Sequence, residues 1–431
     1  MTIKTSVKLP AVNDAGKIDA NTIDKVTNND GSIETASITL STAEPDDSVG
    51  EDGDIWVQYK VKGHYKYYGV KIAKSVSDPV TALTYTDDAE GMSPGWDNWK
   101  DTPIFSGIKP CVLKDGVVQY YLNPNDYTKR ADGGASTINS TTAGDVMIEI
   151  PKLGYKMTSD SNYHYINVTD DPEAEGYCYL AHSKNSPGDC DYIYVGAYLG
   201  CVSSSKLYSI SGQTLTVNTT LTNFRTYATA RGSNYELFSF YPLTLLQCLF
   251  LLIYKNRNSQ TALGQGYTGD SDRQTTGTTN SNSFNYGSTS TTSSVKFLGI
   301  EDFWGNCFYW VDGLYNNSSR QLCTYYKNFK NTDSGASPDY TLATGVSSNI
   351  SNYISDVIGT NNGGFVPKAT SGSNSTYYCD YGYLYASCCA LFGGRWSDGA
   401  RAGAFQLRVY DSASSSGSHI TARLLCKHVA S

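Results

Sequence analysis

Histidine is the side chain best suited to catalysis or metal binding at neutral pH, and this sequence has five. None stands in an HExxH or HxH spacing, so the pattern offers no zinc or non-haem iron site. No GxSxG turn or phosphate-binding loop is present, and no GxGxxG motif follows a predicted strand. Each histidine is interpreted as an isolated surface or strand residue: His64, His164, His182, His419 and His428.

Adjacent acidic residues could supply the two carboxylates of a glycosidase. Those carboxylates must face one cleft at a set separation, which adjacency in the sequence does not establish. The pairs are therefore interpreted as solvated turns: Asp87-Asp88, Asp170-Asp171 and Glu301-Asp302.

Cys379, Cys388 and Cys389 are the thiols that could act as nucleophiles. A nucleophilic cysteine needs a base and an electropositive neighbourhood, and the sequence shows neither. The eleven cysteines form no CxxC pair, and the start of the sequence has no apolar signal segment. We expect synthesis in a reducing bacterial cytoplasm and mostly buried, unpaired thiols. No catalytic residue, metal ion or cofactor is expected.

The composition indicates a folded chain rich in strands and loops. Of 431 residues only 17% are charged, while 35 are tyrosine and 40 are glycine. The net charge of −8, without a block of Lys or Arg, argues against binding to nucleic acid or to anionic membranes. The apolar stretch 237–254 is barely long enough to span a bilayer and contains Pro242, Thr244 and Gln247. It predicts a buried helix that starts near Pro242, and no membrane insertion.

Turn signals and alternating apolar residues predict the elements that must position any site. Residues 55–62 and 65–73 read as a hairpin, and Asp115-Gly116 between two apolar runs predicts another. Residues 146–150, 192–198 and 303–315 read as strands, and the Ser/Thr/Asn/Gly-rich residues 268–295 as a long exposed loop. The predicted fold class is α+β, with few helices and long loop insertions.

Several stretches occur together in one order: 144–152 (GDVMIEIPK), 191–198 (DYIYVGAY), 243–250 (LTLLQCLF), 299–313 (GIEDFWGNCFYWVDG), 392–405 (FGGRWSDGARAGAF) and 422–423 (AR). Over about residues 100–431 they resemble phage and gut-bacterial proteins with a C-type lectin fold, of the branch that includes formylglycine-generating enzymes. The polar, acidic residues 1–50 are predicted as an N-terminal attachment arm and residues 51–99 as a small β module. The resemblance implies a C-type-lectin-like domain over residues 100–431.

The C-terminal stretch, about residues 380–423, also resembles the variable region of proteins diversified by retroelements. In that family a reverse transcriptase miscopies adenines. Changes at the adenines of an AAC codon can give codons for Arg, Ser, Asp, Tyr, Gly or His. Gln406 is not reachable in this way and is taken as fixed. The variable, outward-facing ligand contacts are then predicted as Tyr383, Tyr385, Ser387, Arg395, Ser397, Asp398, Arg401, Arg408, Tyr410, Asp411, Gly417 and His419.

A rigid frame would carry these side chains. The glycines at 393, 394, 399 and 403 would hold turns and close backbone approaches. The core positions would be Trp396, Ala400, Ala402 and Phe405. Tyr, Ser and Arg at the outward positions would supply rigid contact area and adaptable hydrogen bonds, as in antibody loops.

The resemblance implies a non-enzymatic phage adhesin, a tail-fibre type of receptor-binding protein in the virion. Its partners would be a host cell-surface protein or glycan and other tail subunits, and it would form a homo-oligomer, a trimer by family analogy. Other interpretations stay open. Residues 392–423 could be an ordinary Gly-rich hairpin, and the chain a tailspike-like glycan depolymerase or a purely structural decoration or baseplate protein. A copper-binding cysteine pair, as in formylglycine-generating enzymes, would need a sequence context that does not match here.

Overall fold

The computed structural model describes residues 38–41, 55–58, 65–329, 340–343 and 346–429. The chain divides into two compact units, Met1–His64 and Tyr65–Ser431. In the first unit β1 (Ile38–Ser41) pairs in parallel with β2 (Ile55–Gln58). Most of the predicted arm lies outside the described residues. The hairpin predicted from residues 55–73 is wrong, because the strand at 67–73 pairs with strands further along the chain.

The second unit begins with a four-stranded antiparallel sheet in the order β4-β3-β10-β9. Its strands are β3 (Tyr67–Ala73), β4 (Leu83–Asp87), β9 (Gly154–Ser159) and β10 (Tyr163–Thr169). The strands on either side of residue 100 therefore share one sheet. The compact unit starts at Tyr65, whereas the sequence-based division was placed near residue 99.

A seven-stranded sheet follows in the order β14-β27-β11-β8-β5-β6-β7. The strand between β5 and β11 is β8 (Asp145–Pro151), and the others are β5 (Lys109–Lys114), β6 (Val117–Asn123), β7 (Asp126–Arg130), β11 (Cys190–Gly196), β14 (Tyr235–Leu237) and β27 (Leu424–Val429). Asp115 and Gly116 both have positive φ, 52° and 81°, which matches the twist of a two-residue hairpin turn. The predicted β5–β6 hairpin is confirmed.

The last third of the chain forms an eight-stranded sheet with the path β19-β18-β17-β24-β25-β23-β20, and β26 pairs with β17. The bounds are β17 (Phe308–Asn316), β18 (Leu322–Tyr325), β19 (Tyr340–Ala343), β20 (Ile350–Tyr353), β23 (Tyr381–Leu384), β24 (Cys388–Phe392), β25 (Leu407–Asp411) and β26 (Ile420–Thr421). Short two-stranded ladders complete the strands: β12 (Cys201–Ser203) with β13 (Lys206–Tyr208), β15 (Lys296–Phe297) with β16 (Ile300–Glu301), and β21 (Asp356–Val357) with β22 (Pro367–Ala369).

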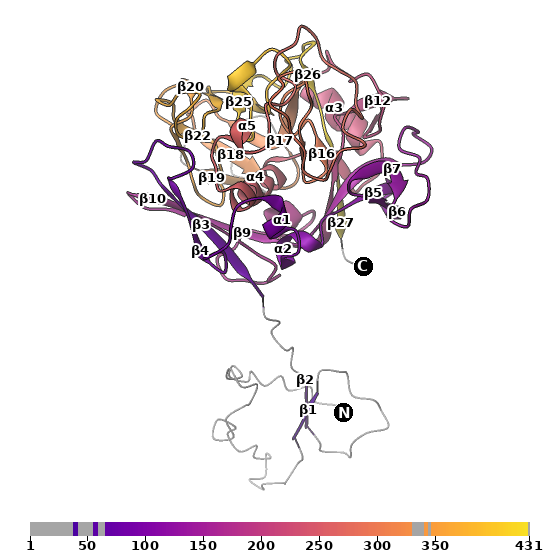
Figure 1. Ribbon diagram of the computed structural model, residues 1–431, viewed down its shortest axis with the longest axis horizontal. Coiled ribbons are helices and arrows are strands. Elements are labelled where there is room, and N and C mark those ends of the chain that lie inside the picture. The colour runs from indigo at the N-terminus through magenta and orange to yellow at the C-terminus, as the bar shows by residue number, and fades with distance from the viewer. Residues whose placement is uncertain (1–37, 42–54, 59–64, 330–339, 344–345, 430–431) are drawn as a thin grey trace. The chain divides into compact units, whose positions relative to one another are not determined.

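Helices are few. They are α1 (Trp96–Trp99), α2 (Pro103–Ser106), α3 (Leu221–Thr229), α4 (Phe240–Tyr254) and α5 (Ser259–Ala262), with the 3₁₀ turns η2 (Leu180–His182) and η3 (Gly399–Arg401). The described unit is thus mainly β-sheet with a few helices (Figure 1).

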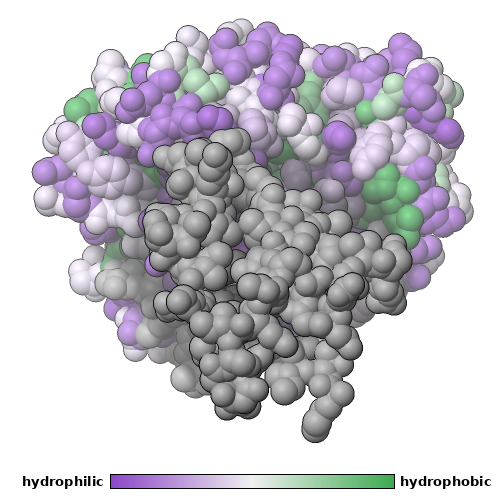
Figure 2. All heavy atoms as spheres, turned by 90° about the horizontal axis from the view of Figure 1, so that it is seen from below, coloured by the Kyte–Doolittle hydropathy of each residue, from purple (hydrophilic) through white to green (hydrophobic). Residues whose placement is uncertain are grey.

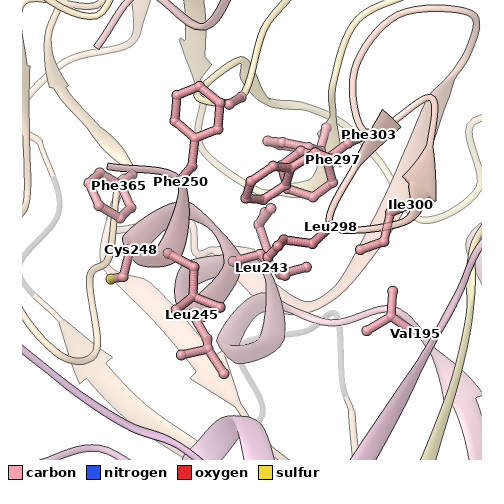
Figure 3. Close-up of a cluster of buried hydrophobic side chains, with 14 of the residues drawn as sticks. Val195, Leu243, Leu245, Cys248, Phe250, Phe297, Leu298, Ile300, Phe303 and Phe365 are labelled. Atoms are coloured by element: carbon pink, nitrogen blue, oxygen red, sulfur yellow. The ribbon is translucent and has the colours of Figure 1, made fainter. Parts of the chain in front are cut away.

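Helix α4 is the centre of the core, as its mainly apolar sequence predicts. Pro242 lies in its first turn, where its missing N–H leaves no intrahelical bond unmade, and Lys255 ends it in a left-handed conformation. Every residue of α4 from Phe240 to Ile253 is buried. Leu243 and Phe250 face Phe297, Leu298 and their neighbours in the cluster drawn in Figure 3. None of the described helices is long and apolar enough to cross a membrane.

Residues 268–295 contain no helix or strand, in line with the sequence, but the prediction of a wholly exposed loop is wrong. Thr268, Thr276, Thr279, Phe284 and Ser294 are buried. The loop therefore packs as part of the core. On the part of the surface that Figure 2 leaves uncovered, hydrophilic residues predominate and hydrophobic ones lie in separate small areas.

Candidate ligand-binding face

Strands β23 and β25 run side by side in parallel, with Tyr383 opposite Arg408. Successive side chains of a strand point to opposite sides. On β23, Gly382 and Leu384 are buried while Tyr381 and Tyr383 are half-buried. On β25, Leu407 and Val409 are buried while Arg408 is half-buried and Tyr410 is 46% exposed. The aromatic and basic side chains of both strands therefore share one outward surface. We call the twelve predicted contact residues the candidate face.

Tyrosine rings form an unbroken row across this surface. Ring centroids are 5.3 Å apart for Tyr353 and Tyr381, 4.9 Å for Tyr381 and Tyr383, 6.0 Å for Tyr383 and Tyr410, and 4.8 Å for Tyr410 and Tyr385. Such separations are favourable for tilted and edge-to-face aromatic pairs. We refer to these five residues as the tyrosine row. Each ring is held by its neighbours, so the row presents contact area that is already ordered.

Arg408 lies at the centre of the row. Its guanidinium carbon is 5.4 Å from the Tyr383 ring centroid and 4.8 Å from that of Tyr410. Its Nε donates to Asp411 Oδ2 at 2.6 Å. Arg401, which is exposed, lies with its guanidinium 5.3 Å from the Tyr381 ring centroid. These contacts fix two cations over aromatic faces, an arrangement that is attractive in itself and leaves donors for a ligand.

A second part of the face is the turn after β24. Gly393 and Gly394 have φ of 93° and 85°, a conformation that glycine adopts without steric cost. Asp398 then accepts from Arg395 through both the backbone N–H and Nε, each at 3.3 Å. The turn is tied to distant loops, since the Trp396 N–H donates to Asn306 O at 3.0 Å. Ser397 is exposed at its tip.

His419 connects the two parts. Its imidazole lies 6.3 Å from the Phe308 ring, and Arg408 lies 5.6 Å from the same ring. Burial lowers the pKa of His419, and the positive charges of Arg395 and Arg408 lower it further. The ring therefore favours its neutral form. Gly417 accepts from the Asn218 N–H at 3.0 Å, which anchors the preceding loop.

None of the twelve predicted contact residues is buried. Ser387, Ser397, Arg401 and Tyr410 are exposed, and the other eight are half-buried. The sequence reasoning missed Tyr353 and Tyr381. Tyr381 precedes Tyr383 by two residues on the same strand, so alternation alone could have found it. Tyr353 belongs to β20, a separate strand that only the fold brings alongside β23.

Under the face, the frame is tightly packed. A Cβ on Gly403 would lie 2.1 Å from Asp380 Oδ1, and one on Gly394 would lie 2.2 Å from Gln406 Oε1. Asp380 is buried and its Oδ2 accepts from the Phe405 N–H at 2.7 Å. Burial raises the pKa of Asp380 well above its usual range. Only glycine fits at these two positions without displacing a neighbour.

The core helix holds this frame in place. Gln247 Nε2 donates to Ala404 O at 2.8 Å, and the Phe250 ring meets the Phe405 ring edge-on at 6.0 Å. Ala402 and Phe405 are fully buried, as predicted. The prediction of core positions at Trp396 and Ala400 is only partly right: Trp396 is half-buried against the core cluster, and Ala400 is half-exposed.

The cysteines do not have the surroundings of nucleophiles or metal ligands. Burial raises the pKa of Cys379 and Cys389 to about 12 and that of Cys388 to about 11, so all three are thiols at neutral pH. Ten of the eleven cysteines are buried, and Cys388 is half-buried. Across the described ranges no group of three or more His, Cys, Asp or Glu side chains could hold a metal ion.

The acidic pairs differ from one another. Asp87 and Asp88 are exposed: Asp87 ends β4 and Asp88 begins the turn that follows it. Glu301 and Asp302 are buried, so the interpretation as a solvated turn is wrong for this pair, and Asp171 is buried as well. Glu301 accepts from the Gly277 and Thr279 N–H groups at 2.6 and 2.7 Å. Glu301 therefore accepts hydrogen bonds from backbone N–H groups of the 268–295 loop.

Two histidines are buried rather than isolated at the surface. His182 lies fully buried in η2, so its interpretation as a surface or strand residue is wrong. His164 on β10 lies between Ser159 Oγ, 2.6 Å from Nδ1, and Asp356 Oδ1, 2.6 Å from Nε2. This set has the residue types of a hydrolase triad. However, the Ser159 hydroxyl donates to Gly359 O at 2.8 Å, so it joins β9 to the 356–359 segment instead of standing free to attack.

No protein-family model matches the chain, and no curated protein matches it either. Among solved structures, the Major Tropism Determinant M1 variant is similar at 14% identity and a TM-score of 0.29, over 75% of this chain and 72% of that one. The U1 variant has 14% identity and a TM-score of 0.27, over 81% and 76%. The P3c variant has 12% identity and a TM-score of 0.27, over 84% and 72%.

Proposed function

We propose that this chain is a non-enzymatic receptor-binding protein of a bacteriophage, with a C-type-lectin-like fold, that recognises a host-surface protein or glycan through the candidate face. The observation that carries the proposal is the tyrosine row with Arg401 and Arg408 lying on it, at the surface and supported from beneath by core packing. Tyr and Arg are the residue types most often found as binding hot spots.

The energetics of such a surface favour binding. A tyrosine has few rotatable bonds, and the rings of the row already restrain one another, so little conformational entropy is lost when a ligand packs on them. Arg395 and Arg408 are paired with Asp398 and Asp411, three residues along the chain in each case. Their orientation is thereby fixed while the net charge of the face stays small. A ligand would meet directed hydrogen-bond donors and not a diffuse positive field.

The packing also supports diversification at the predicted positions. On the two strands of the face, Tyr383, Arg408 and Tyr410 lie on the outward side, whereas Leu384, Leu407 and Val409 fill the core from the inward side. An exchange among Tyr, Ser, Asp, Arg, Gly or His on the outward side would leave those core contacts in place. The frame positions Gly394 and Gly403 do not tolerate such exchange. This separation is what a retroelement-diversified region requires.

In this proposal the chain works in the tail or host-attachment apparatus of the virion. Residues 1–50 attach it to a neighbouring tail subunit, and a trimeric assembly multiplies weak contacts into avidity. The resemblance described from the sequence supports the trimer and the virion location.

The test replaces Arg395, Arg401, Arg408 and Tyr410 together by alanine in the virion and measures adsorption to the bacterial host. We expect adsorption to be abolished while the Tm of the purified chain stays nearly unchanged. The matched control is Tyr120→Ala with Arg130→Ala, a second cation–π pair at 4.2 Å on β6 and β7. It should leave adsorption intact.

Unaltered adsorption of the quadruple variant would remove the proposed function. Release of reducing sugar from host capsule by the purified chain would favour the depolymerase instead. Failure of the purified wild-type chain to bind host cells, with normal virion assembly, would favour a decoration or baseplate role.

A further inference from the structure

A hollow of about 610 Å³ lies in another part of the compact unit, away from the candidate face. It is bounded by α1 and α2, by strands β5 and β6, and by the 283–285 segment of the long loop. Figure 1 places α1, α2 and β6 well apart from β20 and β25, which carry the candidate face. The volume falls within the range of about 300–1,000 Å³ that is usual for small-molecule sites.

The wall of the hollow is aromatic. Trp96 is half-buried, and its ring meets Phe105 edge-on at 5.7 Å and Phe284 at 5.6 Å with an interplanar angle of 41°. Phe105 and Phe284 are buried beneath it. The Tyr121 ring, which is 38% exposed, also lines the hollow, and its hydroxyl donates to Glu149. The aromatic side chains are thus held in place before any ligand arrives.

Two hydrogen-bond donors in this wall lack protein acceptors. The buried neighbour Trp99 donates its indole N–H to Ser93 O at 3.1 Å, but no acceptor among the described residues takes the Trp96 indole N–H. Asn285 accepts from the Leu298 N–H through Oδ1 at 2.9 Å, while its buried Nδ2 has no partner. The Asn285 Nδ2 is enclosed by protein and costs free energy, whereas the Trp96 N–H is not among the buried unpaired atoms and can bond to solvent or to a ligand.

The charges at the rim balance. Asp97 and Asp101 line the hollow together with Lys100 and Lys109, and Lys100 Nζ lies 3.3 Å from Asp97 Oδ1. A strongly anionic ligand would meet two carboxylates, and a purely aliphatic one would leave the donors unpaired. The hollow therefore fits an uncharged ligand that has one apolar face and many hydroxyl groups.

We propose that this hollow is a binding site for a neutral saccharide, with a sugar ring stacked on Trp96 and its hydroxyl groups bonded to Asp101 and Asn125. The C–H face of a pyranose matches the aromatic wall. Its hydroxyl groups both donate and accept, so they pair with the carboxylate and the amide alike. The site is independent of the candidate face and adds a second, chemically different contact with a glycan-coated surface.

The test uses the full chain and saturation-transfer NMR with a defined set of probes. The neutral probes are the methyl glycosides of glucose, galactose, mannose and N-acetylglucosamine and their linear tetrasaccharides, and glucuronate is the charged counterpart of glucose. We expect at least one neutral probe, and not glucuronate, to receive saturation. Loss of one hydrogen bond in Asp101→Ala should weaken its binding about five- to tenfold.

Trp96→Ala should abolish the signal, with a thermal melt to verify that the chain is folded. The exposed Asp101 makes no contact on which folding depends, so Asp101→Ala keeps the test valid if Trp96→Ala does not fold. Tyr165→Ala, on strand β10 and outside the lining of the hollow, is the control and should leave the signal unchanged. The proposal is overturned if no neutral probe binds, if glucuronate binds better, or if Asp101→Ala binds the probe as tightly as the wild type.

Discussion

Helix α4 and the outward side of β23 and β25 are both built from large side chains, but their surroundings differ. In α4 every side chain from Phe240 to Ile253 packs against other protein atoms on all sides. On β23 and β25 only alternate residues do so, and the tyrosine row packs mainly against itself. The contacts of α4 therefore stabilise the fold, whereas the candidate face keeps uncovered area that a partner could contact. The same contrast separates residues that cannot vary from residues that can.

The sharpest test of this contrast is Phe250→Ala. The Phe250 ring lies 5.3 Å from that of Phe297 and also meets Trp304 and Phe405, so its removal leaves a cavity in the densest part of the core. We expect the free energy of unfolding to fall by about 3–5 kcal/mol, measured by urea denaturation. A loss below about 1 kcal/mol would contradict the central role of α4.

The frame beneath the face should respond almost as strongly. In Gly403→Ala the added Cβ would lie 2.1–2.4 Å from atoms of the buried Asp380 carboxyl, which must move from its bond to the Phe405 N–H. We expect a loss of about 2–3 kcal/mol by the same measurement. Gly399→Ala is the control: no atom lies within 4 Å of its added Cβ, and only its φ of 55° opposes the change, at about 1 kcal/mol. Equal losses of stability in the two variants would show that the close contact with Asp380 is not what destabilises Gly403→Ala.

His182 gives the core a pH dependence. It is fully buried in η2, which packs against α4, and neither ring nitrogen has a hydrogen-bond partner among the described residues. Burial, and to a lesser degree the charges of Lys152 and Lys427, lower the pKa of His182 to about 3. The folded state thus excludes a proton that the unfolded state binds below pH about 6.5. The contribution of His182 is present above that pH and is lost as the pH falls toward 3.

Acidification from pH 6.5 to 5 should therefore destabilise the wild type by about 2 kcal/mol more than His182→Leu, which has nothing to protonate. Urea midpoints at both pH values make the comparison. Parallel pH profiles for the two proteins would exclude His182 as the cause.

The smallest effect on stability is expected at the face. Tyr410→Ser removes a ring that is 46% exposed, and the core contacts of Val409 beside it stay in place. We expect the free energy of unfolding to change by no more than about 0.5 kcal/mol, while adsorption to the host falls markedly. A large loss of stability would mean that the tyrosine row is part of the fold and not a surface kept for a partner.

Much of the local structure was predictable. The Asp115-Gly116 turn, helix α4 and the buried thiols follow from short-range signals that no distant contact overrides. The outward direction of Arg408 and Tyr410 follows from strand alternation. Two of the failed predictions, and one missed residue, concern places where the fold supplied the partner. The hairpin over residues 55–73 failed because β3 pairs with β4 and β10, the 268–295 loop is buried against Glu301, and Tyr353 joins the row from β20.

Three properties of this protein can be read from the sequence alone: where apolar and polar residues alternate, where a turn requires glycine, and which side chains could contact a ligand. These properties depend on neighbours within a few residues. Three others appear only in the folded chain: the tyrosines of β20, β23 and β25 form one row, Asp380 excludes a side chain at Gly403, and Trp96 and Asn285 line one hollow. Those outcomes depend on which distant segments pack together, and that choice is made by burial of the whole core rather than by local sequence.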